Sequence, residues 1–183
     1  MAYFNTREIA TITMFAALWG VLSSLFAPIV FQMFGLPILC DMIGFAVLIL
    51  SVWWIRKLGA ATMVGLIATG VNFVFNPSGF HFLGFTAASI VLDTITRFAG
   101  YDRCFKNSLS TTVSMLSVSV LSAAVAGLII GTFFMAAPAL ARWGGVLGWA
   151  GLHAVGGVIG SFIGITLVMG LSIRGVRRMD VKG

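Results

Sequence analysis

Positive charge is confined to a few short stretches of this chain, and the intervals between these stretches are long and apolar. Ten of the eleven Lys and Arg residues fall into four groups, and only Arg142 lies elsewhere. The groups are Arg7; Arg56 and Lys57; Arg97, Arg103 and Lys106; and Arg174, Arg177, Arg178 and Lys182. Each interval can hold two apolar helices, and cytoplasmic loops of membrane proteins carry an excess of Lys and Arg. The spacing therefore predicts a chain that returns to the cytoplasm at every group.

The composition indicates the same environment. Hydrophobic residues make up 60% of the chain and charged residues 9%, which is too apolar for one soluble core of this size. One span needs roughly 20 apolar residues, so residues 1–183 can form a single membrane domain with short loops. The net charge of +6 is explained by topology and by anionic lipid headgroups, without a nucleic-acid partner. We expect an all-α protein of the cell membrane, with six transmembrane helices and both termini cytoplasmic.

Proline and turn residues divide the chain into these spans. Pro28 and Pro37 lie in an apolar outer connection over residues 26–37. Residues 76–79 (Asn-Pro-Ser-Gly) form a turn signal, and Pro138 ends the fifth span. The predicted spans are residues 7–30, 38–55, 58–75, 80–99, 108–136 and 146–173.

Several polar side chains are predicted to lie at one depth, in the outer leaflet. Polar groups are costly inside a bilayer, and a set that shares one depth indicates a site better than any single member does. We expect this set to bind a small heterocycle from outside, although each residue alone could instead bond across helices, and Asp41 could cap the second span. The candidate substrate-binding residues are Gln32, Asp41, Asn72, Asn76, His81, Trp149 and His153.

Other polar residues favour different functions. Asp93 lies four residues before Arg97, and this spacing predicts a local ion pair on one helix. In a self-contained channel or secondary carrier, Asp41, Asp93 and a serine stripe (Ser110, Ser114, Ser117) would form the conduit. The sequence has no metal-ligand cluster, phosphate-binding loop or nucleophile–base pair, so we expect neither an enzyme nor a bound metal or cofactor.

Two predicted helices carry small residues four positions apart, a spacing that lets helices approach closely in a membrane. On the first span these are Ala16, Gly20 and Ser24, with Ala10, Thr13 and Ala17 beside them. We expect the first ridge either to dock a partner or to pack inside the bundle. On the last span, Gly156, Gly160 and Gly164 are expected to pack inside the bundle.

The N-terminal segment resembles a known family. Residues 6–10 (Thr-Arg-Glu-Ile-Ala), followed by residues 13–23 (Thr-Met-Phe-Ala-Ala-Leu-Trp-Gly-Val-Leu-Ser), are similar to the opening of the substrate-binding S components of energy-coupling factor (ECF) vitamin transporters. Residues 55–61 (Ile-Arg-Lys-Leu-Gly-Ala-Ala) resemble an inner turn of the members related to thiamine or hydroxymethylpyrimidine uptake.

The resemblance implies a receptor that hydrolyses nothing itself. It implies a vitamin-like substrate held near the outer ends of the helices, beneath a lid formed by residues 26–37. It also implies docking through Ala16, Gly20 and Ser24 to a transmembrane T subunit, with ATP used by two separate ATP-binding subunits. The alternatives left open are a stand-alone secondary carrier or channel and a structural membrane protein without a ligand.

Overall fold

The computed structural model describes residues 3–176, and every regular element in that range is an α-helix. Five helices are long and apolar enough to cross a membrane, and α3 is a shorter apolar helix of 16 residues. The architecture is therefore compatible with a helical membrane protein. The helices are α1 (Thr6–Phe34), α2 (Ile38–Ile55), α3 (Ala60–Phe75), α4 (Phe82–Ala99), α5 (Tyr101–Cys104), α6 (Ser108–Phe133), α7 (Ala137–Arg142) and α8 (Gly145–Ile173).

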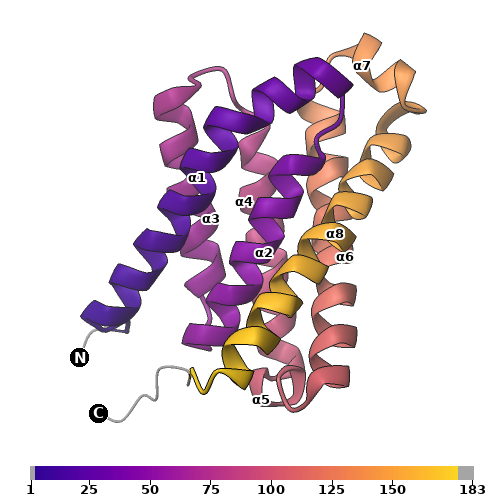
Figure 1. Ribbon diagram of the computed structural model, residues 1–183. Helices are drawn as coiled ribbons and strands as arrows, with labels where there is room; N and C mark the ends of the chain where they lie inside the picture. The colour runs from indigo at the N-terminus through magenta and orange to yellow at the C-terminus, as the bar shows by residue number, and fades with distance from the viewer. Residues whose placement is uncertain (1–2, 177–183) are drawn as a thin grey trace.

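The long helices stand side by side in one bundle (Figure 1). α1 packs against α2 and α3, α3 against α4, α4 against α6, α6 against α8, and α8 against α2, so these six helices close into a ring. α2 also contacts α3, α4 and α6, and it is the most buried of the five long helices. The start of α1, the end of α8 and α5 lie at one end of the bundle, called the α5 end, and α7 lies at the opposite, α7 end (Figure 1).

The helix boundaries follow the predicted spans except near the α7 end. α2 has the predicted limits, whereas α6 stops at Phe133 and the short α7 occupies part of the predicted loop. α1 does not end at Pro28 but continues to Phe34, where Gly35 adopts a left-handed conformation (φ 70°) and its N–H donates to the Phe31 carbonyl. A proline removes one backbone hydrogen bond without forcing a membrane helix to end. The last turns of α1 therefore lean across the α7 end (Figure 1).

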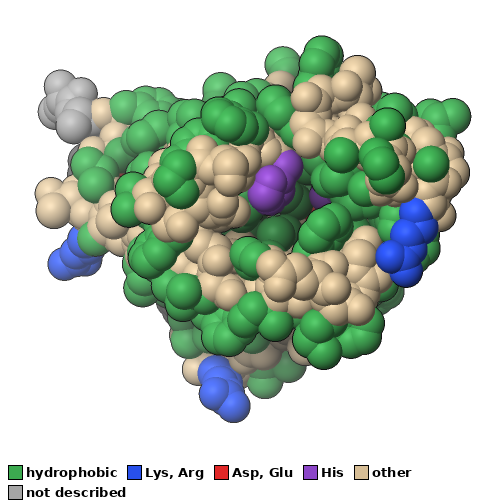
Figure 2. Space-filling model, turned by 90° about the horizontal axis from the view of Figure 1, so that it is seen from above, with side chains coloured by type: hydrophobic (Ala, Val, Ile, Leu, Met, Phe, Trp, Pro, Cys, Tyr) green, Lys and Arg blue, Asp and Glu red, His purple; other side chains and the backbone are tan. Residues whose placement is uncertain are grey.

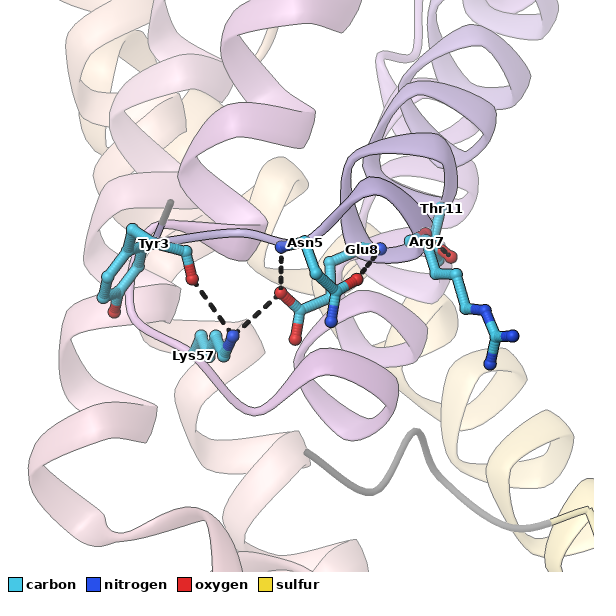
Figure 3. Close-up of polar contacts among 6 residues, drawn as sticks. All are labelled: Tyr3, Asn5, Arg7, Glu8, Thr11 and Lys57. Carbon is cyan, nitrogen blue, oxygen red and sulfur yellow. Dashed lines mark hydrogen bonds and ion pairs between the residues drawn. The ribbon is translucent and has the colours of Figure 1, made fainter. Parts of the chain in front are cut away.

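The start of α1 is tied to the turn between α2 and α3 (Figure 3). The Asn5 side chain accepts from the Glu8 N–H and the Glu8 carboxylate accepts from the Asn5 N–H, both at 2.9 Å, which is a capping box. Lys57 donates to the same carboxylate at 2.8 Å and to the Tyr3 carbonyl at 3.0 Å. Glu8 is fully buried, so Lys57 neutralises a carboxylate that water does not reach. Arg7 points away from this cluster (Figure 3).

Glycines on α8 allow close contact with α2. A Cβ added at Gly160 would lie 2.6 Å from the Asp41 carbonyl oxygen, and one added at Gly164 would lie 3.1 Å from the Cα of Ala46. Both separations are shorter than ordinary van der Waals contacts, so only glycine lets the two backbones approach this far. The predicted glycine ridge on the last span therefore packs inside the bundle.

The small-residue ridge on α1 is covered by α3, so in this structure it has the second of its two expected roles, packing inside the bundle. Ala16, Gly20 and Ser24 are all buried, and a Cβ at Gly20 would lie 2.8 Å from the Val71 side chain. Ser24 is bonded to Asn72 of α3. The neighbouring small residues Ala10, Thr13 and Ala17 are the exposed ones. In this conformation the ridge is not accessible to a partner, and the exposed small-residue face of α1 lies beside it.

The Asp93 carboxylate is bound by hydrogen bonds from the start of α3 and not by the predicted ion pair with Arg97. Oδ2 of Asp93 accepts from the Gly59 N–H, the Thr62 N–H and the Thr62 hydroxyl, each at 2.9 Å. A carboxylate at a helix N-terminus satisfies backbone N–H groups that have no partner within the helix. Asp93 therefore caps α3 from α4, and Arg97 is exposed.

Candidate ligand-binding site

A cavity of about 210 Å³ opens at the α7 end of the bundle. All six helices of the ring contribute to its lining, and the turn between α1 and α2 does so as well. The last turns of α1 cover it from one side with Ala27, Pro28 and Phe31. Figure 2 looks onto this end and shows a hollow with histidine at its rim and hydrophobic side chains around it.

The structure brings six of the seven predicted substrate-binding residues to this cavity. Three of them are almost completely buried and three are more exposed, so the lining has a deep tier and an outer tier. Asn72, Trp149 and His153 form the deep tier, at 1%, 0% and 1% exposure. Gln32, Asn76 and His81 form the outer tier. The seventh residue, Asp41, is fully buried behind the lining.

Asp41 contacts His153 rather than the cavity. Nδ1 of His153 lies 3.1 Å from Oδ1 and 2.9 Å from Oδ2 of Asp41, and the hydrogen bond is directed at Oδ1. Asp41 comes from the first turn of α2, where Pro37 is the N-cap residue and no side chain caps the helix. The alternative role of Asp41 as a cap is therefore not seen, and the residue joins α2 to α8.

Asn72 lines the cavity and has an unused acceptor. Its Nδ2 donates to the Ser24 hydroxyl at 2.9 Å, and that hydroxyl donates to the Gly20 carbonyl at 2.5 Å. Its Oδ1 is buried and has no partner among the described residues. Leaving a buried polar atom unpaired costs about 1–3 kcal/mol. A ligand N–H or an ordered water molecule at this position would remove that penalty.

Aromatic rings form a continuous wall beside these polar atoms. Trp149 meets Phe31 edge-to-face, with ring centroids 6.3 Å apart, and its ring lies 5.9 Å from that of His153. Phe85 meets His153 from the other side at 5.5 Å. Such walls suit a planar ring, since aromatic faces and edges attract one another. Nε1 of Trp149 is buried without a hydrogen-bond partner in residues 3–176, so this lining residue also has an unused donor.

Sequence reasoning missed two polar residues of the lining. Ser23 is fully buried with its hydroxyl beside the thiol of Cys40, and that thiol is also buried and belongs to no disulfide. Ser23 lies one turn before Ala27, at the depth predicted for the other polar residues, so the same depth argument could have found it. Nothing in the sequence distinguishes Cys40 from an apolar core residue.

The conduit of the channel hypothesis does not coincide with the cavity. Asp93 caps α3 towards the α5 end, and Ser117 is exposed on α6. The Ser110 hydroxyl donates to the Arg103 carbonyl. These residues are absent from the cavity lining. Within residues 3–176, no three His, Cys, Asp or Glu side chains are grouped as metal ligands.

Comparisons with known proteins do not assign the chain to a family. No protein-family model, no curated protein and no solved structure matches it. The interpretation of the cavity therefore depends on its own geometry and on the sequence resemblance described above.

Proposed function

We propose that this chain is the substrate-capture subunit, or S component, of an ECF-type importer. It binds a vitamin or vitamin precursor from outside the cell and delivers it inward when docked to a T subunit and two ATP-binding subunits. The observation that carries this proposal is the cavity at the α7 end. Six residues singled out for ligand binding line that cavity, and three polar atoms of its deep tier have no partner among the described residues.

The lining favours a small, planar heterocycle as the ligand. Asn72 Oδ1 accepts hydrogen bonds, Trp149 Nε1 donates them, and the Ser23 hydroxyl can do either. The aromatic wall supplies ring contacts. No Lys, Arg, Asp or Glu belongs to the described lining. These features suit a neutral ring with neighbouring donor and acceptor atoms, as in an aminopyrimidine, better than a phosphate ester or a simple ion.

The charge distribution supports an orientation in which the α7 end faces outside. The basic residues of the described chain gather around the α5 end, whereas Arg142 lies in α7. Under the positive-inside bias, the α5 end then faces the cytoplasm and the cavity opens outwards. In this proposal α3 also crosses the membrane, which makes six spans, and both termini are cytoplasmic. Residues 177–183, which hold the rest of the last basic group, lie outside the described residues.

Docking to the T subunit is proposed to use the exposed small-residue face of α1, formed by Ala10, Thr13 and Ala17. Small exposed residues let a partner helix approach closely within a membrane. We expect the double variant Ala10→Leu/Ala17→Leu to lose co-purification with the T subunit and the ATPases. Gly151→Leu is the matched control, because Gly151 is exposed on α8 and an added Cβ there meets no atom within 4 Å.

Native mass spectrometry of the purified chain tests ligand capture. We expect a retained small molecule, and we expect Trp149→Ala and His153→Ala each to reduce its occupancy. Trp54→Ala is the control, since Trp54 is a half-buried tryptophan near the α5 end of α2. Retention that is unchanged in both cavity variants would contradict the proposed site. Substrate transport by the isolated chain in liposomes without ATP would instead favour a secondary carrier or channel.

A further inference from the structure

The contact between Asp41 and His153 is almost completely buried. The Asp41 side chain is 0% exposed and that of His153 1%. Glycine at position 156 permits this contact, because a Cβ there would lie 2.5 Å from Asp41 Cβ and 2.6 Å from its Oδ2. On the other side of the ring, a Cβ at Gly127 would lie 3.0 Å from Cβ and Cδ2 of His153. The contact is therefore closely packed between α2, α6 and α8.

The two ring nitrogens of His153 have different environments. Nδ1 meets the carboxylate of Asp41, whereas Nε2 belongs to a side chain of the cavity lining and has no partner among the described residues. In a neutral imidazole one nitrogen donates and the other accepts, and the hydrogen bond at one nitrogen sets the role of the other. A carboxylate accepts from Nδ1–H, so Nε2 of the neutral ring is then an acceptor on a residue of the cavity lining.

We propose that Asp41 is a positioning residue that fixes the tautomer of His153, so that Nε2 accepts a hydrogen bond from an N–H group of the ligand. The ligand part of this proposal rests on the proposed function, whereas the tautomer part concerns the protein alone. Asp41 does not touch the ligand. With acceptors at both His153 Nε2 and Asn72 Oδ1, the deep tier selects rings that carry N–H donors, as amino-substituted heterocycles do.

The tautomer can be measured on the full chain without any ligand. His81→Gln leaves His153 as the single histidine, because the sequence has two, and a purification tag without histidine keeps it so. Long-range proton–nitrogen correlations of the ¹⁵N-histidine-labelled protein in detergent at neutral pH distinguish the nitrogens, since Nε2 couples to both ring carbon-bound protons. We expect Nδ1 to carry the proton and Nε2 to be bare. A proton on Nε2, either alone or on both nitrogens, would overturn the proposal.

Two aspartate variants separate positioning from general packing. Asp41→Ala should convert the single-tautomer spectrum into one of exchanging tautomers, whereas Asp93→Asn, at the second buried aspartate of residues 3–176, should leave it unchanged. An unchanged spectrum in Asp41→Ala would also overturn the proposal. The tautomer of the His81→Gln protein with Asp41 intact remains decisive if Asp41→Ala does not fold, which circular dichroism and gel filtration would show.

Binding of a matched pair of probes tests the consequence for selectivity. 4-Amino-2-methylpyrimidine carries an N–H donor that 2,4-dimethylpyrimidine lacks. We expect the unsubstituted protein to bind the amino compound about tenfold more tightly, the effect of one hydrogen bond, and we expect Asp41→Ala to lose most of that preference. Equal preference in both proteins would contradict the role of Asp41. If neither probe binds while Nδ1 carries the proton, the proposed ligand class fails and the assigned tautomer stands.

Discussion

Single side chains in the deep tier combine near-complete burial with unused hydrogen-bonding atoms. Trp149 and Asn72 are each at most 1% exposed, yet Nε1 of the first and Oδ1 of the second have no partner among the described residues. Buried polar groups in folded proteins usually find a partner, so atoms of this kind beside a cavity indicate where a ligand or water bonds. Removal of one of these atoms should therefore weaken ligand binding more than it lowers the stability of the protein.

Trp149→Phe tests this separation, because it removes the N–H group and keeps an aromatic ring. We expect ligand affinity to fall by about 1 kcal/mol, roughly fivefold in Kd, measured by calorimetry or by native mass spectrometry. Trp19→Phe is the matched control, since Trp19 is 1% exposed with an unpartnered Nε1 but lies outside the described cavity lining. An equal loss of affinity in both variants would show that the effect comes from packing.

Gly156→Ala should destabilise the protein through Asp41. The added methyl would lie 2.5 Å from Asp41 Cβ, and overpacking of this kind costs about 1–3 kcal/mol. Thermal unfolding in detergent can be followed with a thiol-reactive dye, because Cys40 and Cys104 are both free and buried. Gly151→Ala should not lower the unfolding temperature, as its Cβ meets open space and alanine favours a helix. A lower temperature for both variants would contradict this explanation.

Among the helices, α1 departs most from what its sequence predicts. Pro28 suggested an end, but the helix continues to Phe34, and its last turns cover the cavity. A single sequence shows where a proline can stop a helix, not whether neighbouring helices support the chain beyond it. In contrast, the turn at residues 76–79 was predictable, because Asn, Pro and Gly there all disfavour continuation of α3.

Pairing between helices was the least predictable feature. The common depth of Asn72, Trp149 and His153 follows from their positions along apolar segments, and the cavity lies at that depth. The contact of Asp41 with His153 joins residues 112 positions apart, and no local pattern specifies such a partner. For the same reason, the small-residue spacing of Gly20 indicated close packing but could not show that α3 would cover it.

The start of α1 depends on a residue outside that helix. Lys57→Met would leave the buried Glu8 carboxylate without its cation, and we expect a loss of about 2 kcal/mol, in the range for a hydrogen bond to a charged group. Unfolding temperatures in detergent would measure it. Arg7→Met removes a neighbouring positive charge that points away from the cluster (Figure 3) and should have little effect. Similar decreases of the unfolding temperature in the two variants would indicate that removal of any positive charge near the start of α1 lowers stability, and not the loss of this contact in particular.

For the molecule as a whole, the orientation and the number of spans can be tested together at α3. This helix has 16 residues and is about 24 Å long at 1.5 Å per residue, shorter than a hydrocarbon core of about 30 Å. The proposed topology requires it to cross, with local thinning of the bilayer or support from neighbouring helices. The turns at its two ends, with Leu58 and Ser78, would then lie on opposite sides of the membrane.

Single cysteines at these turns provide the measurement. We expect Ser78→Cys to react with a membrane-impermeant maleimide in intact cells, and Leu58→Cys to react only after the membrane is opened. Both positions are exposed, and the two native cysteines are buried, so background labelling should be low. Labelling of both positions from the same side would contradict a crossing by α3, and the reverse pattern would contradict the orientation.

The central place of α2 has a consequence for synthesis of the protein. Asp41 leaves the ribosome 112 residues before His153, a delay of roughly 6–22 s at 5–20 residues per second. During that interval a carboxyl group lies within an apolar segment while its partner does not yet exist. We therefore expect chains interrupted before α8 to be less stable than the full chain, because Asp41 of α2 lacks its partner in them.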